Sequence, residues 1–185
     1  MRKTFLFMMV SADGYFEGVN NDISWHNTDD EFNDFATEQL DEADTLVFGR
    51  KTYELMASYW PTTAGTNDDP ETAARMNSYE KIVFSKTPLK TDWENVQAYK
   101  DDVVSVISTL KQQAGKNIAV LASSNLCLTL IREGLLEEVR LMVNPVVLGK
   151  GTSLFTGLAC RLDLTLVSSR TFRNGNVLLT YNVIK

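Results

Sequence analysis

An unbroken apolar run near the start of the chain, Phe5–Val10, places the narrowest limit on how the chain can fold. A strand with one face in water alternates apolar and polar residues, whereas a strand that is buried on both faces is apolar throughout. The run is far too short for a signal sequence or a membrane span, and Ser11-Ala12-Asp13-Gly14 ends it at once. It therefore predicts a central strand of a sheet that helices cover on both faces.

Strands and helices are then expected to alternate as far as about residue 135. The pattern predicts four further strands: Thr45–Phe48, Lys81–Ser85, Asn95–Tyr99 and Asn117–Leu121. Apolar residues at helical spacing predict helices that begin at four positions: Asp29, Arg50, Val103 and Ser124. The polar segments Ala12–Thr28 and Pro61–Asp69 are interpreted as loops.

After residue 135 strands dominate. Glu137–Val143 is predicted as a strand that Asn144-Pro145 ends. The last two strands, about 163–172 and 177–184, flank Arg173-Asn174-Gly175-Asn176, a strong hairpin signal. The whole pattern predicts a three-layer α/β fold, with a mostly parallel central sheet, helices on both faces and an antiparallel C-terminal hairpin. No linker or repeat interrupts it, so residues 1–185 are expected to form one domain.

The charge balance argues against some classes of partner. The chain has 18 Lys and Arg residues against 24 Asp and Glu residues, a formal charge of −6. Such an excess disfavours binding to a phosphate backbone, although one local basic pocket can still hold a small anion. We therefore expect no nucleic-acid partner. Because no apolar stretch suits a signal sequence or a membrane span, we also expect a cytoplasmic protein without a membrane partner.

Residue types with reactive side chains are few. Cys127 and Cys160 are far apart without CxxC spacing, and His26 is the only histidine. A zinc site of Cys and His ligands is therefore not expected, and no metal is assigned. A Ser-His-Asp or Cys-His triad would have to use His26, which has no nucleophile signature beside it. Both thiols are expected to be reduced and buried.

Three junctions between a predicted strand and the segment after it carry side chains suited to ligand binding. Ligands of open α/β sheets bind beyond the carboxyl ends of the strands, where helix N-termini offer free N–H groups. The junctions are Gly49-Arg50-Lys51-Thr52, Ser85-Lys86-Thr87 and Ala122-Ser123-Ser124-Asn125. Taken singly, the first two are better explained as a tight turn and a polar strand end, and the third is open between a helix N-cap at Ser123 or Ser124 and a phosphate or ribose site. Neither GxGxxG nor the Walker loop is present.

Two weaker signals lie in the segments Ser11–Tyr15 and Gly149-Lys150-Gly151, each of which can be a simple turn. The first of them follows the apolar strand Phe5–Val10 and should open onto the same sheet edge as the three junctions. Four weak signals at one edge together favour a binding site there.

Three segments of the chain resemble one known family: Ser11–Tyr15, Leu46–Glu54 and Leu135–Phe155. The last is the most specific, because it joins Leu135–Leu141 to the run Asn144–Gly151. Over essentially its whole length, the chain resembles the C-terminal reductase domain of the bifunctional riboflavin-biosynthesis deaminase-reductase. The members it most resembles are stand-alone bacterial proteins. The zinc deaminase half, with its HxE and PCxxC patterns, is missing, so the bifunctional enzyme is excluded.

That resemblance implies a dihydrofolate reductase-like fold and a reductase that uses NADPH. It implies that Gly49, Arg50 and Thr52 hold the pyrophosphate and that Ser85 and Lys86 face the adenosine 2′-phosphate. It further implies a second phosphate-side loop, formed by Ala122, Ser123, Ser124 and Asn125. Two other residues, Ser11 and Asp13, would lie near nicotinamide and substrate. The family usually has glycine where Ala122 stands. An alanine there costs little if its φ is negative, but its methyl could block a close backbone approach.

The implied reaction is hydride transfer to a small heterocycle, pterin- or pyrimidine-like, which also requires a proton. Asp13 is the candidate donor or substrate anchor, provided that burial raises its pKa. Water and the acids Asp29, Asp30 and Glu31 are alternatives. Two other readings stay open, namely reduction of a different carbonyl or imine compound and a non-catalytic module that binds a nucleotide or its own twin.

A homodimer is expected as well. The C-terminal strands and the apolar segment Leu141–Leu148 offer more hydrophobic sequence than one small sheet edge needs to bury, and the resembled family is commonly dimeric.

Overall fold

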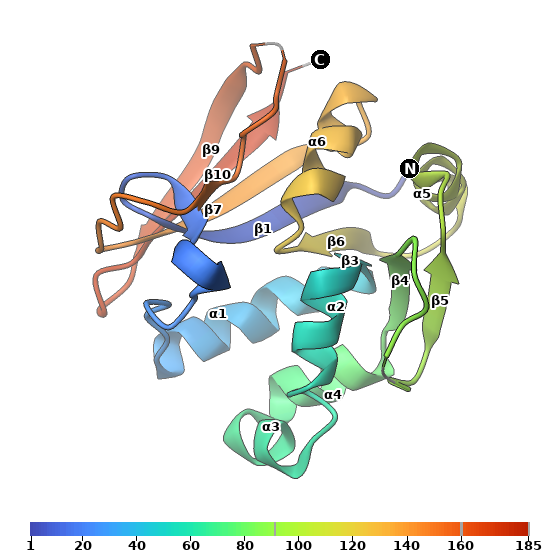
Figure 1. Cartoon of the computed structure of the whole chain (residues 1–185), viewed down its shortest axis with the longest axis horizontal. Helices are drawn as coiled ribbons and strands as arrows, with labels where there is room; N and C mark the ends of the chain where they lie inside the picture. The colour runs from blue at the N-terminus through green and yellow to red at the C-terminus, as the bar shows by residue number, and fades with distance from the viewer. Residues whose placement is uncertain (91, 160, 185) are drawn as a thin grey trace.

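The computed structural model describes residues 1–90, 92–159 and 161–184. Its central element is an eight-stranded sheet in the order β5-β4-β3-β6-β1-β7-β10-β9 (Figure 1). The strands from β5 to β7 all run parallel, and β10 and β9 pair antiparallel at the end. The bounds of these strands are β1 Thr4–Ser11, β3 Ala43–Gly49, β4 Glu80–Phe84, β5 Val96–Tyr99, β6 Asn117–Leu121, β7 Glu138–Asn144, β9 Leu164–Thr171 and β10 Val177–Val183. The predicted fold is confirmed, each predicted strand lying within two residues of its expected bounds.

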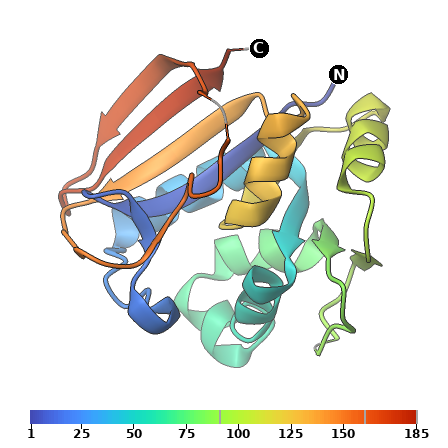
Figure 2. The same cartoon turned by 45° about the horizontal axis from the view of Figure 1, so that its top comes forward.

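Helices cover both faces of the sheet, as the apolar run Phe5–Val10 required. Four of them, α1 to α4, lie on one side and α5 and α6 on the other (Figures 1 and 2). Strand β1 shows the consequence, because Phe5 and Met9 pack on the α1 side whereas Leu6, Met8 and Val10 pack on the α6 side. The helix bounds are α1 Asp30–Asp41, α2 Arg50–Ala57, α3 Thr63–Asp68, α4 Pro70–Ser78, α5 Val103–Gln112 and α6 Ser124–Arg132.

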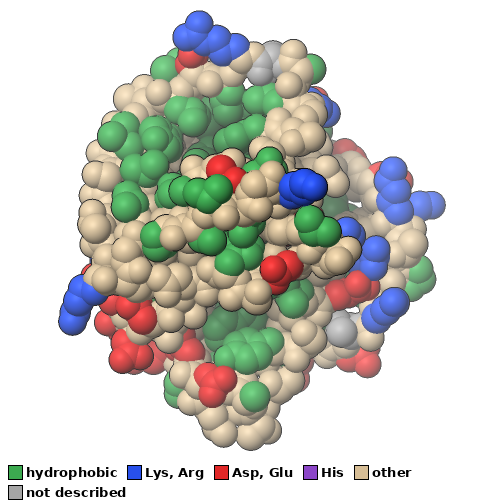
Figure 3. All heavy atoms as spheres, turned by 60° about the vertical axis from the view of Figure 1, so that its left-hand side comes forward, with side chains coloured by type: hydrophobic (Ala, Val, Ile, Leu, Met, Phe, Trp, Pro, Cys, Tyr) green, Lys and Arg blue, Asp and Glu red, His purple; other side chains and the backbone are tan. Residues whose placement is uncertain are grey.

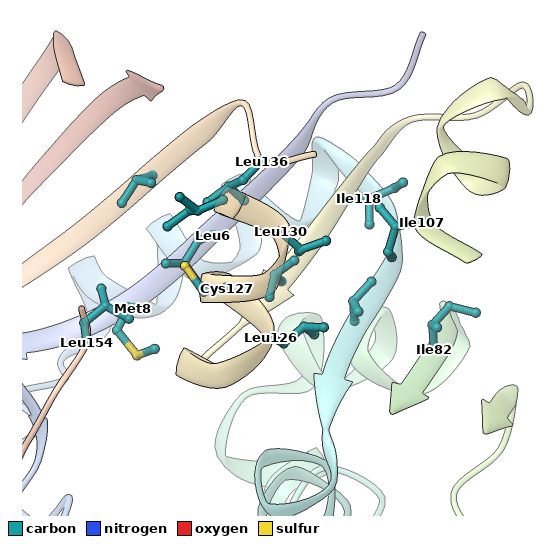
Figure 4. Close-up of a cluster of buried hydrophobic side chains, with 14 of the residues drawn as sticks. Leu6, Met8, Ile82, Ile107, Ile118, Leu126, Cys127, Leu130, Leu136 and Leu154 are labelled. Carbon is teal, nitrogen blue, oxygen red and sulfur yellow. The ribbon is translucent and has the colours of Figure 1, made fainter. Parts of the chain in front are cut away.

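On the α6 side of the sheet, core side chains pack this helix against the parallel strands (Figure 4). Leu126, Cys127 and Leu130 of α6 pack among side chains of β1 and β6, which include Leu6 and Ile118. Burial confirms the expectation for Cys127 and raises the pKa of its thiol to about 12. Cys160, the other cysteine, lies outside the described residues. None of the helices in the described ranges is long and apolar enough to cross a membrane.

The two segments predicted as loops contain short regular elements instead. Pro61–Asp69 contains α3 (Thr63–Asp68), whose start is capped by the Thr62 hydroxyl, which accepts from the Gly65 N–H. Six small and polar residues carry no apolar periodicity, so that helix was invisible in the sequence pattern. Within Ala12–Thr28, β2 (Tyr15–Glu17) pairs with β8 (Thr152–Ser153) to form a separate two-stranded sheet. This pairing brings two distant loops together at the carboxyl edge of the main sheet.

Candidate functional site

A cleft of about 920 Å³ crosses the carboxyl ends of β3, β4 and β6, which are neighbours in the sheet. Every residue of the three predicted junctions that was assigned to the cofactor lines it, namely Gly49, Arg50, Thr52, Ser85, Lys86, Ala122, Ser123, Ser124 and Asn125. We call this hollow the first cleft. Its size is within the range of ligand sites in proteins.

Two of the junctions are in direct contact inside the first cleft. The Gly49 N–H donates to the Ser123 hydroxyl over 3.2 Å, and a Cβ at Gly49 would lie only 2.7 Å from that oxygen. A side chain at position 49 would therefore displace the Ser123 hydroxyl, although the φ of −80° itself suits any residue. Ser123 is the N-cap residue of α6, one of the two positions that the sequence offered, but its hydroxyl makes no cap hydrogen bond to the helix.

Two helices that begin at the first cleft, α2 and α6, lack side-chain caps, whereas α5, whose N-cap Asp102 also lines this cleft, has one. Neither α2, which follows Gly49, nor α6, which follows Ser123, has a side chain bonded to its first N–H groups. In α1, α3, α4 and α5 an Asp or Thr side chain accepts from such a group. Uncapped N–H groups and the positive end of the helix dipole together attract anions.

Cationic side chains surround these helix starts. Arg50, Lys51, Lys86 and Lys100 line the first cleft. Arg50 is engaged by Glu54 one turn later in α2, at 2.9 Å. Within the described ranges no carboxylate pairs with Lys51, Lys86 or Lys100. The first cleft therefore offers cations without a carboxylate partner among the described residues, although Glu17, Asp101 and Asp102 line it as well.

Ala122 adopts a left-handed backbone conformation, with φ of +48°. The condition under which alanine would cost little, a negative φ, is not met. The Thr52 hydroxyl donates to the Ala122 carbonyl over 2.7 Å and holds the turn against the start of α2. Left-handed alanine is strained by about 1–2 kcal/mol, so this turn has the geometry for which glycine is suited.

A second cleft, of about 670 Å³, adjoins the first. It extends between α1, α2 and α4, and most of the side chains that line it are apolar, among them Phe7, Phe32, Met56 and Trp60. The residues shared by both clefts mark the junction between them; these are Phe16, Glu17, Arg50, Lys51, Thr52 and Ala122. A ligand in the first cleft can thus meet a smaller molecule in the second.

The second cleft also contains residues that sequence reasoning passed over. His26, considered only for triads and zinc sites, lines it together with Gln39 and Glu54. Burial lowers the pKa of His26, while a hydrogen bond with the Phe16 backbone and the charge of Asp22 oppose that shift. Gln39 had a visible signal, because this polar residue interrupts the apolar face of α1 that Phe32, Phe35, Ala36 and Leu40 define. Lys100 and His26 had none.

Asp13 and Ser11 line neither cleft. The Asp13 carboxylate accepts from the Ser11 hydroxyl at 2.7 Å and from the N–H groups of Leu148 and Gly149 at 3.1 and 2.8 Å. These hydrogen bonds, that of Ser11 first, lower its pKa rather than raise it. The condition set for Asp13 as a proton donor is therefore not met, and its contacts are those of a clamp on the loop after β7.

The alternative acids at the start of α1 also line neither cleft. Asp29 caps the helix by accepting from the Phe32 N–H, and Asp30 is exposed. Glu31 accepts from the Arg173 N–H and lies near the guanidinium groups of Arg170 and Arg173. The carboxylates that do line the second cleft are Glu17 and Glu54.

The parallel sheet with its antiparallel end and paired clefts is of the dihydrofolate reductase type. Dihydrofolate reductase from Enterococcus faecalis matches 99% of this chain and 97% of its own, with a TM-score of 0.64 at 15% identity. Acinetobacter baumannii RibD matches all of this chain and 58% of its own, with a TM-score of 0.74 at 16% identity.

Sequence comparison narrows this class to one family. Residues 2–178 match the RibD C-terminal domain family, and the chain belongs to it. The uncharacterized protein YyaP of Bacillus subtilis (strain 168) is 34% identical over 187 residues, which cover 98% of this chain and 95% of YyaP. The resemblance stated from the sequence is therefore confirmed.

Proposed function

We propose that the protein is a cytoplasmic NADPH-dependent reductase that transfers a hydride to a small heterocycle, pterin- or pyrimidine-like. The observation that carries this proposal is the meeting of two uncapped helix starts, α2 and α6, in one cleft lined by Lys86 and Lys100. Phosphate groups require such N–H donors and cations. The dihydrofolate reductase that shares the fold was crystallised with NADP(H).

The residues of the first cleft fit a dinucleotide. The bare backbone at Gly49 and the α2 and α6 N–H groups would hold the pyrophosphate, with Thr52 fixing the turn at Ala122. Lys86, exposed and without a carboxylate partner among the described residues, would hold the adenosine 2′-phosphate beside Ser85. Arg50 is turned to Glu54 and would orient the junction instead.

NADPH supplies the hydride when bound, and the chain supplies position and a shielded volume. The shared residues Phe16, Thr52 and Ala122 would place the two partners against each other at the junction of the clefts. The apolar walls of the second cleft would exclude water from the reacting face. Since Asp13 clamps a loop, the proton would come from water or through Glu17 or Glu54.

The test uses NADPH with deuterium on one face of C4, first the pro-R and then the pro-S position. The protein is mixed with a panel of dihydropterins and aminopyrimidines, and the products are analysed by mass spectrometry. A reductase is expected to deliver deuterium from one of the two labelled cofactors only. Transfer from neither, across the panel, contradicts the proposal.

We also propose that the protein is a homodimer. Val177, Leu179 and Tyr181 are half-buried on one face of β10, and Leu166, which pairs with Tyr181, is 53% exposed. Figure 3 shows hydrophobic side chains gathered on the side of the molecule that carries β9 and β10. This group contains no charge, so a second copy can face it without repulsion between like charges.

Light scattering at micromolar concentration tests the dimer. We expect twice the mass of the 20.8 kDa chain for the wild type and one chain mass for Leu179→Lys. Val104→Lys replaces an apolar residue that is 38% exposed on α5, away from β9 and β10 (Figure 1), and should leave the dimer intact. A wild-type mass of one chain contradicts the proposal.

A further inference from the structure

Three polar side chains that line the second cleft each have an atom without any hydrogen-bond partner. The atoms are Gln39 Oε1, Glu54 Oε1 and His26 Nε2, and all are shielded from solvent. Among the described residues only Asn176 has another such side-chain atom, and it does not line this cleft. A buried polar atom without a partner costs free energy, and most proteins avoid it. Three of them around one hollow therefore point to a ligand that supplies the missing partners.

Gln39 makes the strongest case of the three. It is only 4% exposed and lies on the face of α1 that otherwise presents Phe35 and Leu40 to the core. The nearby hydroxyl of Thr72 is bonded to Thr37 at 2.9 Å rather than to Gln39. Packing alone would be served better by leucine at this position, since leucine has a similar size and no polar atom to satisfy.

The three unpartnered atoms are all suited to accept hydrogen bonds. Gln39 offers an amide oxygen, and Glu54 offers the carboxylate oxygen that Arg50 leaves free. In neutral His26 the ring nitrogen opposite the Phe16 hydrogen bond carries a lone pair. The ligand must therefore bring N–H or O–H donors on more than one of its edges.

The charges of the second cleft set a further limit on its ligand. Arg50 and Lys51 lie at the junction with the first cleft, and none of the described residues that line the second cleft alone is Lys or Arg. A phosphate or carboxylate placed beyond the junction would meet Glu54, whose partner cation Arg50 is already engaged in that ion pair. The aromatic walls around Phe32 and Trp60 suit a flat ring.

We propose that Gln39, Glu54 and His26 form an acceptor set which selects an uncharged, flat heterocycle with N–H donors and rejects phosphorylated or N-alkylated rings. This rests on the proposed function, because it names the substrate class of the same reductase. The side chains would turn their free atoms to the ligand on binding. Gln39 and His26 are thus specificity-determining residues.

The test compares lumazine with 1,3-dimethyllumazine, which has the same bicyclic core but carries methyl groups in place of the two N–H donors. Each is titrated into the wild-type chain with and without NADPH. Lumazine is expected to bind at least about tenfold more tightly, as one or two hydrogen bonds to buried acceptors provide. Equal affinities, or no binding of lumazine, overturn the proposal.

The variant Gln39→Leu distinguishes a role of Gln39 in ligand recognition from a role in the stability of the fold. It should lower lumazine affinity about tenfold, leave 1,3-dimethyllumazine unaffected, and maintain or raise the melting temperature because an unsatisfied buried atom is removed. Gln112→Leu, at an exposed position of α5, is the matched control and should change neither affinity. An unchanged preference in Gln39→Leu overturns the proposal.

NADPH binding measured in the same samples keeps the two proposals apart. A chain that binds NADPH but holds both rings equally overturns the acceptor set and supports the reductase. A chain that prefers lumazine but binds no NADPH supports the acceptor set and overturns the cofactor assignment.

Discussion

Gly49 and Ser123, 74 positions apart in the sequence, are joined by a hydrogen bond of 3.2 Å from the Gly49 N–H to the Ser123 hydroxyl. Because each residue immediately precedes an uncapped helix, this bond sets the relative position of the two helix starts. Any phosphate held between α2 and α6 depends on that spacing.

Gly49→Ala is expected to weaken NADPH binding about tenfold and to lower the free energy of unfolding by about 1 kcal/mol. The new Cβ would lie 2.7 Å from the Ser123 hydroxyl and displace it, whereas the Ser123 Cβ is 3.9 Å away and can stay. Calorimetric titration and denaturant unfolding measure the two effects.

Adding Ser123→Ala to Gly49→Ala provides the control. Without the hydroxyl there is no clash, so the double variant should be no less stable than Ser123→Ala alone. If the two single effects simply add, the contact does not determine the spacing.

Ala122→Gly is expected to stabilise the protein by up to about 1 kcal/mol. Relief of the strain at φ +48° outweighs the extra freedom that glycine gives the unfolded chain. Loss of the methyl should also tighten NADPH binding, since backbone can then approach the cofactor. Ala119→Gly, in the buried middle of β6, is the matched control and should destabilise. Similar losses of stability in both variants would argue against strain at Ala122.

Lys86→Ala should weaken NADPH binding about tenfold and leave NADH binding nearly unchanged, because only NADPH carries the 2′-phosphate. Added salt should reproduce part of the loss. Lys90→Ala removes an exposed cation four residues later that does not line the first cleft, and it should have no effect. Equal weakening for both dinucleotides would remove Lys86 from the phosphate site.

His26 should make stability depend on pH in a window where no other side chain ordinarily titrates. Burial lowers its folded pKa below the unfolded value of about 6.5, so the unfolded chain binds the proton more tightly. The stability from neutral His26 is present in full above about pH 6.5 and is lost as pH falls through the folded pKa. Since His26 is the only histidine, His26→Asn should flatten the stability curve below about pH 6.5. An identical slope in the variant would contradict the assignment.

Much of the fold was predictable because local patterns and packing agree. The apolar run Phe5–Val10 required helices on both faces, and β1 distributes its side chains to both. Arg173-Asn174-Gly175-Asn176 required a hairpin, and β9 and β10 pair around it. The helix α3 escaped prediction because Thr63–Asp68 packs few apolar side chains.

The site was predictable only in part. Gly49, Lys86 and Ser123 follow strand ends, and parallel strands bring such ends to one edge, so their sharing of a cleft followed from topology. Asp13 also follows a strand, but its carboxylate turns to the N–H groups of Leu148 and Gly149, a contact that no spacing encodes. His26 lines the second cleft from the segment that follows β2. Strand β2 pairs with β8, and no pattern in the local sequence predicted that pairing.

The central claim, that the first cleft holds NADPH, is tested most directly by one calorimetric titration of NADPH into the wild-type chain. We expect a single saturable site per chain with micromolar affinity, and weaker binding of NADH by about tenfold through the contact of Lys86 with the 2′-phosphate. The absence of any binding at millimolar NADPH would contradict the account.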